Sequence, residues 1–245
     1  MKLHYTQRGK KHYYTYHERI EVHKETRIRY ARYENQPIDE KTWMKLVQDN
    51  AYYFLLDKAL YKLTFKAHTE KSLFDALEGD VILKKQVIEE LKKLGYIDDA
   101  HLLELYIRDY EFERKSLRAY QEKLLKKGFK KAMLDERFEK IEDDQDTRLT
   151  QALETKVASL KPDTWVKTKE RLMRYAVSLG YDYATIQRCI APFEETFDID
   201  PKPLLQKELK KLKKDTKLTE QKIIDRLRRK GFSYDLIKAT MKEES

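Results

Sequence analysis

The fold of this chain is decided by a pattern that occurs three times, as Leu124-Leu125-Lys126-Lys127-Gly128-Phe129, Ala176-Val177-Ser178-Leu179-Gly180-Tyr181 and Leu227-Arg228-Arg229-Lys230-Gly231-Phe232. Each copy ends in a glycine followed by an aromatic residue, and the glycines lie about fifty residues apart. Apolar residues recur eight and four residues before each glycine, and six and ten residues after it. These spacings indicate an apolar helix face on both sides of the glycine. The chain is therefore predicted to be a helical repeat protein.

A fourth copy of the pattern is predicted upstream, where Val81 takes the place of the glycine. Its apolar residues at matching offsets are Leu73, Leu77, Val87 and Leu91. Gly79 stands two residues before that place, so the turn of this copy is expected to differ from the other three. The chain has only 6 glycines and 5 prolines, which also argues against a turn-rich β fold.

Each repeat is predicted to contain three helices, which in the second repeat cover residues 100–112, 116–127 and 131–141. Either Asp98 or Asp99 is expected to cap the first of these helices. The other expected helix starts are Asp163 and Asp182 in the third repeat and Thr219 and Ser233 in the fourth. A left-handed glycine ends the middle helix. Structural roles are therefore assigned to Gly95, Gly128, Gly180, Gly231, Asp98 and Asp99.

The N-terminal residues follow a different pattern. Residues 3–6 and 12–17 are two short segments in which aromatic and other residues alternate, and residues 7–10 between them have turn composition. This pattern predicts a small β-hairpin. Helices are expected over 22–33 and over 39–49, the second one capped by Asp39. The predicted fold is mainly α, an elongated array of tandem three-helix repeats with a small N-terminal β-hairpin and helix module. The expected domains are 1–50, 51–98, 99–145, 146–198 and 199–245, with joints near 141–146 and 197–203.

The formal net charge is +9, from 52 basic and 43 acidic residues, and the basic residues are clustered. Residues 1–33 carry nine basic and three acidic side chains, and residues 202–217 carry seven lysines. This distribution raises the hypothesis of a nucleic-acid or acidic-protein partner to the same level as that of an ordinary solvated surface. The single cysteine, Cys189, is typical of a reducing compartment, and no run of about 18 apolar residues suggests a membrane span. We therefore expect a cytoplasmic monomer without membrane association.

No motif for catalysis, a cofactor or a metal ion is found. The six histidines lack the spacing of a zinc site, and no glycine-rich loop is suited to phosphates. Cys189 precedes the apolar Ile190 and is expected to be a core residue rather than a nucleophile. Asp98 and Asp99 are better explained as helix caps than as a catalytic carboxylate pair. The chain is predicted not to be an enzyme and to need no cofactor.

Basic side chains are predicted to form exposed helix faces opposite apolar ones. The face of Lys222, Arg226 and Arg229 lies opposite Ile223, Ile224 and Leu227, at helical spacing. Candidate residues for binding a partner or DNA are Arg118, Lys123, Lys126, Lys127, Lys130, Lys131, Lys167, Arg171, Arg174, Lys222, Arg226 and Arg229. A solvated helix surface has the same composition, so both interpretations stay open. Tyr13, Tyr14 and Tyr16 are suited either to packing the hairpin or to stacking on single-stranded bases.

One stretch resembles a known family. Leu91-Lys92-Lys93-Leu94-Gly95-Tyr96-Ile97-Asp98-Asp99, followed by Leu102, Leu103 and Tyr106-Ile107-Arg108-Asp109, resembles the most recognisable part of RecX proteins. The hairpin and the residues up to Trp43 are similar to the lead-in of Gram-positive members, so the resemblance covers nearly the whole chain. The chain departs from the family pattern in the first repeat, at Lys66, at Thr69-Glu70-Lys71-Ser72-Leu73 and at Glu78-Gly79-Asp80.

The resemblance implies a regulator rather than an enzyme. RecX proteins are understood to lie in the groove of the RecA–single-stranded DNA filament, where they suppress strand exchange, ATP hydrolysis and co-protease activity. The implied partners are therefore the RecA filament and single-stranded DNA, with double-stranded DNA as a further candidate. Two alternatives remain at this point. The second hypothesis is a stand-alone nucleic-acid binder that uses the basic faces, and the third is a helical scaffold for an acidic protein.

Overall fold

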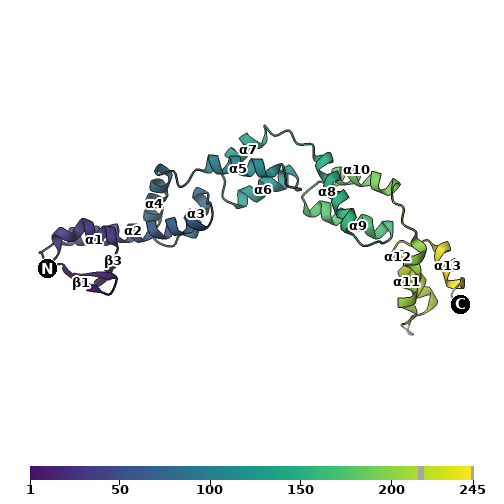
Figure 1. Cartoon of the computed structure of the whole chain (residues 1–245), viewed down its shortest axis with the longest axis horizontal. Helices are drawn as coiled ribbons and strands as arrows, with labels where there is room; N and C mark the ends of the chain where they lie inside the picture. The colour runs from purple at the N-terminus through teal and green to yellow at the C-terminus, as the bar shows by residue number, and fades with distance from the viewer. Residues whose placement is uncertain (215–217, 244–245) are drawn as a thin grey trace. The chain divides into compact units, whose positions relative to one another are not determined.

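The computed structural model describes residues 1–214 and 218–243, and these residues are mainly helical (Figure 1). The N-terminal module contains β1 (His4–Arg8), β2 (Lys11–Thr15), β3 (Arg19–Val22), α1 (Lys24–Tyr30) and the short 3-10 helix η1 (Ala31–Tyr33). The first repeat has α2 (Glu40–Phe65), α3 (Glu70–Ala76) and α4 (Val81–Lys93), and the second has α5 (Asp99–Tyr110), α6 (Leu117–Lys126) and α7 (Lys131–Phe138). The third has α8 (Gln145–Ser159), α9 (Trp165–Ser178) and α10 (Tyr183–Glu195), and the fourth has α11 (Pro201–Lys213), α12 (Glu220–Arg229) and α13 (Tyr234–Glu243).

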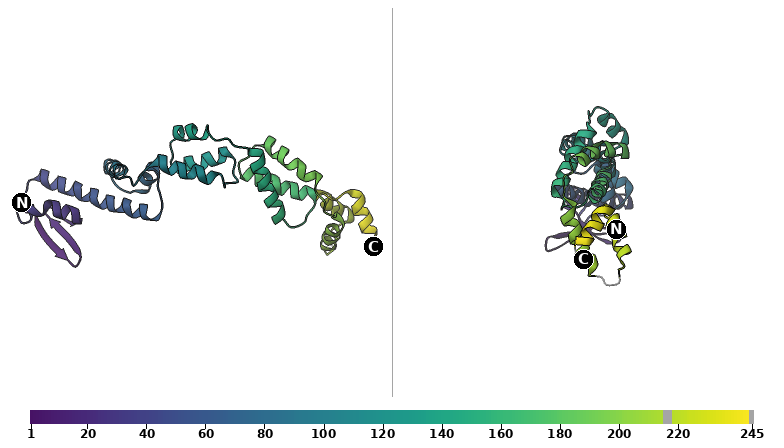
Figure 2. Two further views of the ribbon diagram at one scale, coloured as in Figure 1. Left: turned by 45° about the horizontal axis from the view of Figure 1, so that its top comes forward. Right: turned by 90° about the vertical axis from the view of Figure 1, so that its right-hand side faces the viewer.

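The predicted N-terminal hairpin is confirmed, and a third strand extends it. The three antiparallel strands lie in the order β1-β2-β3, beside α1 and the first half of α2 (Figure 2). The prediction of a helix starting at Val22 was wrong, because Val22 ends β3 and pairs with His12. Its side chain joins Leu3, Tyr14 and Trp43 in the core beneath the sheet. The helix α1 begins after His23, whose Nδ1 accepts from the backbone N–H of Glu25.

The long helix α2 belongs to two cores. It begins at Asp39, whose carboxylate accepts from Thr42 N at 2.8 Å, as expected from the sequence. Its first half contributes Trp43 and Leu46 to the N-terminal core, and its second half contributes Leu55 and Ala59 to the core of the first repeat. Residue 50, where a domain boundary was predicted, lies inside this continuous helix.

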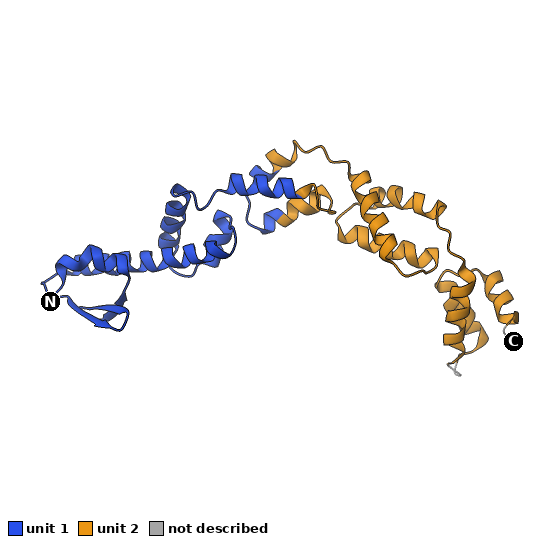
Figure 3. Cartoon of the chain, viewed as in Figure 1, with its two compact units in different colours: residues 1–109, 124–134 blue, residues 110–123, 135–245 orange. Residues whose placement is uncertain are grey.

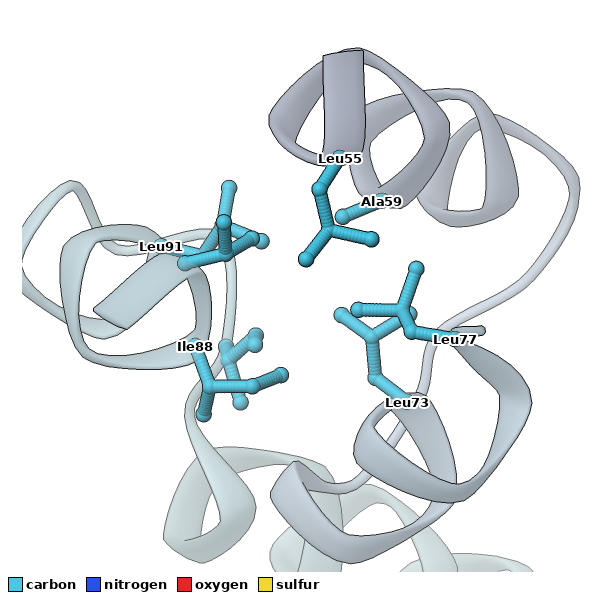
Figure 4. Close-up of a cluster of buried hydrophobic side chains, with 8 residues drawn as sticks. Leu55, Ala59, Leu73, Leu77, Ile88 and Leu91 are labelled. Carbon is cyan, nitrogen blue, oxygen red and sulfur yellow. The ribbon is translucent and has the colours of Figure 1, made fainter. Parts of the chain in front are cut away.

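The chain forms two compact units, residues 1–109 with 124–134 and residues 110–123 with 135–245 (Figure 3). Each unit contains more than one hydrophobic cluster. In the first unit, Leu73 of α3 and Leu77, which directly follows α3, point toward Leu55 of α2 and toward Ile88 and Leu91 of α4 (Figure 4). The second unit buries the predicted offsets around Gly180 and Gly231 in the same manner. The apolar positions predicted for the four repeats are therefore buried, except Met241, which is only partly buried.

The glycines of the repeats end helices in the left-handed region. Gly128, Gly180 and Gly231 have φ values of +97°, +87° and +93°, and Gly95 has +77°. In each case the aromatic residue that follows donates its N–H to a carbonyl five residues earlier, as Tyr181 does to Ala176 at 3.3 Å. This is the hydrogen-bond pattern of the Schellman motif, which left-handed glycine permits without steric cost. The structural roles predicted for these glycines are therefore confirmed.

Consecutive repeats meet at what we call the inter-repeat joint, the contact between a buried N-cap hydroxyl and the glycine turn of the next repeat. Ser116 caps α6 by accepting from Ala119 N, and it donates to the carbonyl oxygen of Gly180 at 2.8 Å. Thr69 donates in the same way to the Lys127 carbonyl at 2.8 Å, and Thr164 donates to that of Lys230. One hydroxyl thus satisfies a helix terminus and a neighbouring turn at once.

The predicted caps need one correction. Thr164 rather than Asp163 caps α9, and Asp163 instead accepts from Thr164 N and from Arg171. Asp182, Thr219 and Ser233 take their predicted positions. The two adjacent carboxylates serve different helices. Asp98 accepts from His101 N within its own helix, whereas Asp99 reaches Glu70 N at the start of α3, at 2.9 Å. Burial raises the pKa of Asp99, and its capping hydrogen bond acts in the opposite direction.

Candidate nucleic-acid interface

The basic face of α12 is present as predicted. Ile223, Ile224 and Leu227 are buried in the core of the fourth repeat. The opposite side exposes the side chains of Lys222 and Arg226, with Arg229 one turn further on. Arg229 Nε donates to the carbonyl of Asp225 at 3.4 Å, but none of the three basic groups pairs with a carboxylate among the described residues. The three positive charges thus face solvent without an ion-pair partner among the described residues, although the exposed carboxylate of Asp225 lies on the same helix.

The corresponding face of α9 is electrostatically different. Lys167 pairs with Glu170 at 2.9 Å, and Arg171 pairs with Asp163 at 2.7 Å. Arg174 is exposed and donates to the carbonyl oxygen of Glu170 at 3.3 Å. The pair with Lys167 also lowers the pKa of Glu170, which keeps that carboxylate charged. The positive potential of this face is therefore partly cancelled by its own helix and by the turn before it.

The α6–α7 region divides into two groups of basic residues. Arg118 pairs with Glu122 at 3.2 Å, and Lys123 pairs with Glu113 while lying over the ring of Tyr120. The other four residues of the predicted set are exposed and form no ion pair within the part of the chain that the structure describes. They are Lys126, Lys127, Lys130 and Lys131. The unneutralised charge of this region therefore lies on the turn rather than along α6.

The lysine-rich run at residues 202–217 carries less free charge than its sequence suggests. Lys202 pairs with Glu243 at 3.0 Å. Glu208 accepts from Lys211 at 2.9 Å and also pairs with Lys230, and these lysines lower its pKa. Residues 215–217 of the run lie outside the described residues. The face of α12 is therefore the better candidate surface in the fourth repeat.

Of the three tyrosines considered for base stacking, two are structural. Tyr14 is fully buried and donates to Glu34 at 2.9 Å, and burial raises its pKa. Tyr16 packs on Trp43, and its hydroxyl donates to a backbone carbonyl. Tyr13 lies on the other side of the sheet, with the guanidinium of Arg19 4.0 Å from the ring centroid. Packing of the hairpin is therefore the role of Tyr14 and Tyr16.

The histidine, cysteine and acidic side chains of the described residues form no metal-binding cluster. No group of three or more histidine, cysteine or acidic side chains is placed to hold a metal ion there. Cys189 is buried at 4% exposure, and burial raises the pKa of its thiol, which disfavours the nucleophilic thiolate. Across the same residues, no helix is both long enough and apolar enough to cross a membrane.

The structure adds one basic residue that the candidate set lacks. Lys66 follows the C-terminus of α2 and lines a depression together with Lys126 and Lys127. Lys66 and Lys126 are 60 positions apart in the sequence, so helical periodicity has no means of associating them. The two lysines are brought together by tertiary structure. Lys66 lies three residues before Thr69, the cap of α3, and the Thr69 hydroxyl donates to the carbonyl of Lys127.

Comparison with known proteins gives a consistent family. No protein-family model matches the chain. A protein named Regulatory protein RecX from Streptococcus agalactiae serotype Ia is 30% identical over 196 residues, covering 75% of both chains. Its namesake from Staphylococcus aureus is 26% identical over 235 residues, covering 89% of this chain and 85% of its own. A crystal structure described as regulatory protein RecX has the same fold, with a TM-score of 0.53 at 13% identity over 76% of this chain and 95% of its own.

Proposed function

This chain belongs to the RecX family of regulatory proteins, and we propose that it binds the RecA–single-stranded DNA filament as a non-enzymatic inhibitor. The inhibited activities are strand exchange, ATP hydrolysis and co-protease activity. The proposal implies a cytoplasmic location and a chain that acts as a monomer. The proposal includes no cofactor, because a protein that inhibits the filament by binding to it carries out no chemical reaction.

The observation that carries this proposal is the distribution of unneutralised positive charge. The α12 face (Lys222, Arg226, Arg229) and the α6–α7 turn (Lys126, Lys127, Lys130, Lys131) both expose cations without carboxylate partners among the described residues. A filament that contains DNA presents negative charge along its whole length. Two basic surfaces, one on the second repeat and one on the fourth, suit a partner with extended negative charge better than they suit a single compact ligand.

The test is strand exchange by RecA in the presence of increasing amounts of this protein. Inhibition at concentrations equimolar to RecA or lower supports the proposal, and parallel assays follow ATP hydrolysis and co-protease activity. Co-sedimentation with filaments assembled on single-stranded DNA then establishes direct binding. Unchanged strand exchange with the protein in excess would overturn the proposal.

The same basic surfaces also favour a second candidate, a stand-alone nucleic-acid binder. It predicts tight binding to naked DNA that weakens steeply as salt rises, because binding releases counterions. The two candidates are separated by comparing the affinity for naked single-stranded DNA with that for the filament at one salt concentration. Equal affinities favour the stand-alone binder, whereas much tighter filament binding favours the regulator.

A further inference from the structure

A depression in the first unit lies where the segment between α2 and α3 meets α5 and the end of α6. It is lined by Lys66, Ala67, His68, Thr69, Ser72, Leu102, Tyr106, Lys126, Lys127 and Phe129. Its floor is fixed by the inter-repeat joint, since Thr69 donates to the Lys127 carbonyl and accepts from Ser72 N. The position of Lys127 relative to Lys66 is therefore set by hydrogen bonds and does not depend on flexible side chains alone.

The depression has an unusual charge composition, with three lysines and no carboxylate in its lining. Lys66, Lys126 and Lys127 make no ion pair within the described residues. Lys127 Nζ lies 5.0 Å from the centroid of the Tyr106 ring, over its face. Elsewhere in this chain exposed lysines commonly pair with acidic neighbours, as Lys71 does with Asp75 at 2.8 Å. The positive charges of the three lysines repel one another, and a bound anion would reduce this repulsion.

His68 forms a polar wall of the site and is only 9% exposed. Its Nδ1 lies 3.0 Å from Ser72 Oγ, and that hydroxyl donates to the Thr69 carbonyl at 3.2 Å. The contact with Ser72 Oγ therefore fixes the orientation of the His68 ring in either tautomer. Burial, followed by the charges of Lys66 and Lys62, lowers the pKa of His68. The same lysines that disfavour a charged imidazole favour an anion beside it.

We propose that this depression, walled by Lys66, His68, Lys126 and Lys127, is a binding site for phosphoryl groups. Lysine ammonium groups are common phosphate ligands, and three of them around one concave surface match a diester backbone or a free diphosphate. Leu102, Tyr106 and Phe129 give the depression an apolar and aromatic side beside the lysines. This inference does not rest on the proposed action on a RecA filament, because the free chain is expected to bind the ligand.

The experiment uses inorganic pyrophosphate and a 20-nucleotide oligo(dT) as probes of the full chain. Binding is compared between the wild type, the triple variant Lys66→Gln/Lys126→Gln/Lys127→Gln and the control Lys10→Gln/Lys58→Gln/Lys93→Gln. The control removes three exposed lysines of the same unit that do not line the depression. We expect the site variant to weaken pyrophosphate binding by at least about tenfold and the control by less than about twofold, because direct charged contacts exceed long-range attraction.

A second readout is the His68 ring signal in NMR titrations, assigned with His68→Gln. Bound pyrophosphate offsets the charges of Lys62, Lys66, Lys126 and Lys127 around the ring, so it should raise the pKa of His68. The signal of His101, exposed and outside the depression, should not respond. Thermal denaturation checks that both triple variants remain folded. No His68 response, or equal losses in the two variants, would overturn the site.

The two sources of phosphate are distinguished by competition. If pyrophosphate displaces oligo(dT), and the site variant loses oligo(dT) affinity more than the control does, the natural ligand is a nucleic-acid backbone. If oligo(dT) binding is the same in both variants while pyrophosphate still requires the three lysines, the site serves a free phosphate compound. Either result supports a phosphoryl site. Failure of strand-exchange inhibition would leave these results unaffected and would count only against the regulator.

Discussion

The hydroxyl of Ser116 donates a hydrogen bond of 2.8 Å to the carbonyl oxygen of Gly180, 64 positions later in the chain. The same hydroxyl accepts from Ala119 N, so one buried side chain caps α6 and holds the glycine turn of the next repeat. Thr69 with Lys127 and Thr164 with Lys230 repeat this arrangement. The joint therefore places two requirements on these glycines. The backbone must adopt a positive φ, and there must be no side chain where the preceding repeat approaches.

The first prediction separates these two roles of glycine. A Cβ at Gly180 would overlap Ala119 Cβ, whereas a Cβ at Gly95 would meet nothing within 4 Å. Both residues have positive φ. Gly95→Ala should therefore lower the free energy of unfolding by about 1–2 kcal/mol through backbone strain alone. Gly180→Ala should cost roughly 1–3 kcal/mol more because of overpacking. Thermal and urea denaturation measure both, and equal losses would contradict the close approach at the joint.

The second prediction isolates the hydrogen bond across the joint. Thr164 and Thr219 cap α9 and α12 with the same hydroxyl geometry, each accepting from the N–H three residues on at 3.4 Å. Only Thr164 is buried and also donates to the carbonyl of Lys230. Thr219→Ala should cost about 1 kcal/mol of unfolding free energy, the usual value of a cap. Thr164→Ala should cost roughly 1 kcal/mol more, through the orphaned carbonyl.

A third prediction concerns the partly buried guanidinium of Arg148. Its Nε donates to Asp143, which is 3% exposed, and its Nη1 donates to the carbonyls of Tyr110 and Glu113 at 3.0 and 2.8 Å. Arg148→Met should lower the unfolding free energy by about 3–5 kcal/mol, because it strands a buried carboxylate and loop carbonyls.

The matched control for Arg148 is Arg188, which makes a two-pronged pair with Asp146 at the surface, at 2.9 and 2.8 Å. Its side chain is 59% exposed. Arg188→Met should cost less than about 1 kcal/mol, as expected for a solvated pair. Denaturation midpoints of the two variants give the comparison. Similar losses would mean that the Arg148 network contributes no more than a surface pair.

The fourth prediction tests whether unneutralised charge decides binding to DNA or to the filament. Reversal of Lys222, Arg226 and Arg229 to glutamate should weaken binding strongly, and should lower the slope of log affinity against log salt by about 2 for single-stranded DNA. Reversal of Lys167, Arg171 and Arg174 should have a smaller effect, because two of these residues already pair with Glu170 and Asp163. A larger effect from the α9 variant would reject this ranking.

The fifth prediction is a dependence of stability on pH through His68. Burial and nearby lysines lower the folded-state pKa of His68 below its ordinary value of 6.5. The unfolded chain therefore binds a proton more readily, and stability falls as pH drops through about 6.5 toward the folded-state pKa. Below that value the contribution no longer changes. His68→Gln should flatten the difference in denaturation midpoint between about pH 7.5 and 5.5. If His68→Gln leaves the difference in denaturation midpoint between the two pH values unchanged, groups other than His68 cause the pH dependence.

Several features of this protein were determined by local sequence alone. The offsets around Gly128, Gly180 and Gly231 predicted the buried faces of the repeats, and Asp39, Asp182 and Thr219 predicted helix starts, because helical periodicity and capping act over a few residues. The stretch around Gly95 also indicated the family that the comparisons show. The basic face of α12 followed from the same periodicity.

Other features were decided only by tertiary structure. The strand that ends at Val22 depends on pairing with β2, and the continuity of α2 past residue 50 depends on two cores that share one helix. Asp99 accepts a hydrogen bond from the start of α3 rather than from its own helix. Lys66 and Lys126 line the same depression because the hydrogen bond between Thr69 and Lys127, 58 positions apart, holds their segments together. Sequence spacing predicts which residues share a helix face. Which faces meet, and which charges remain unpaired, is settled by contacts between segments far apart in the chain.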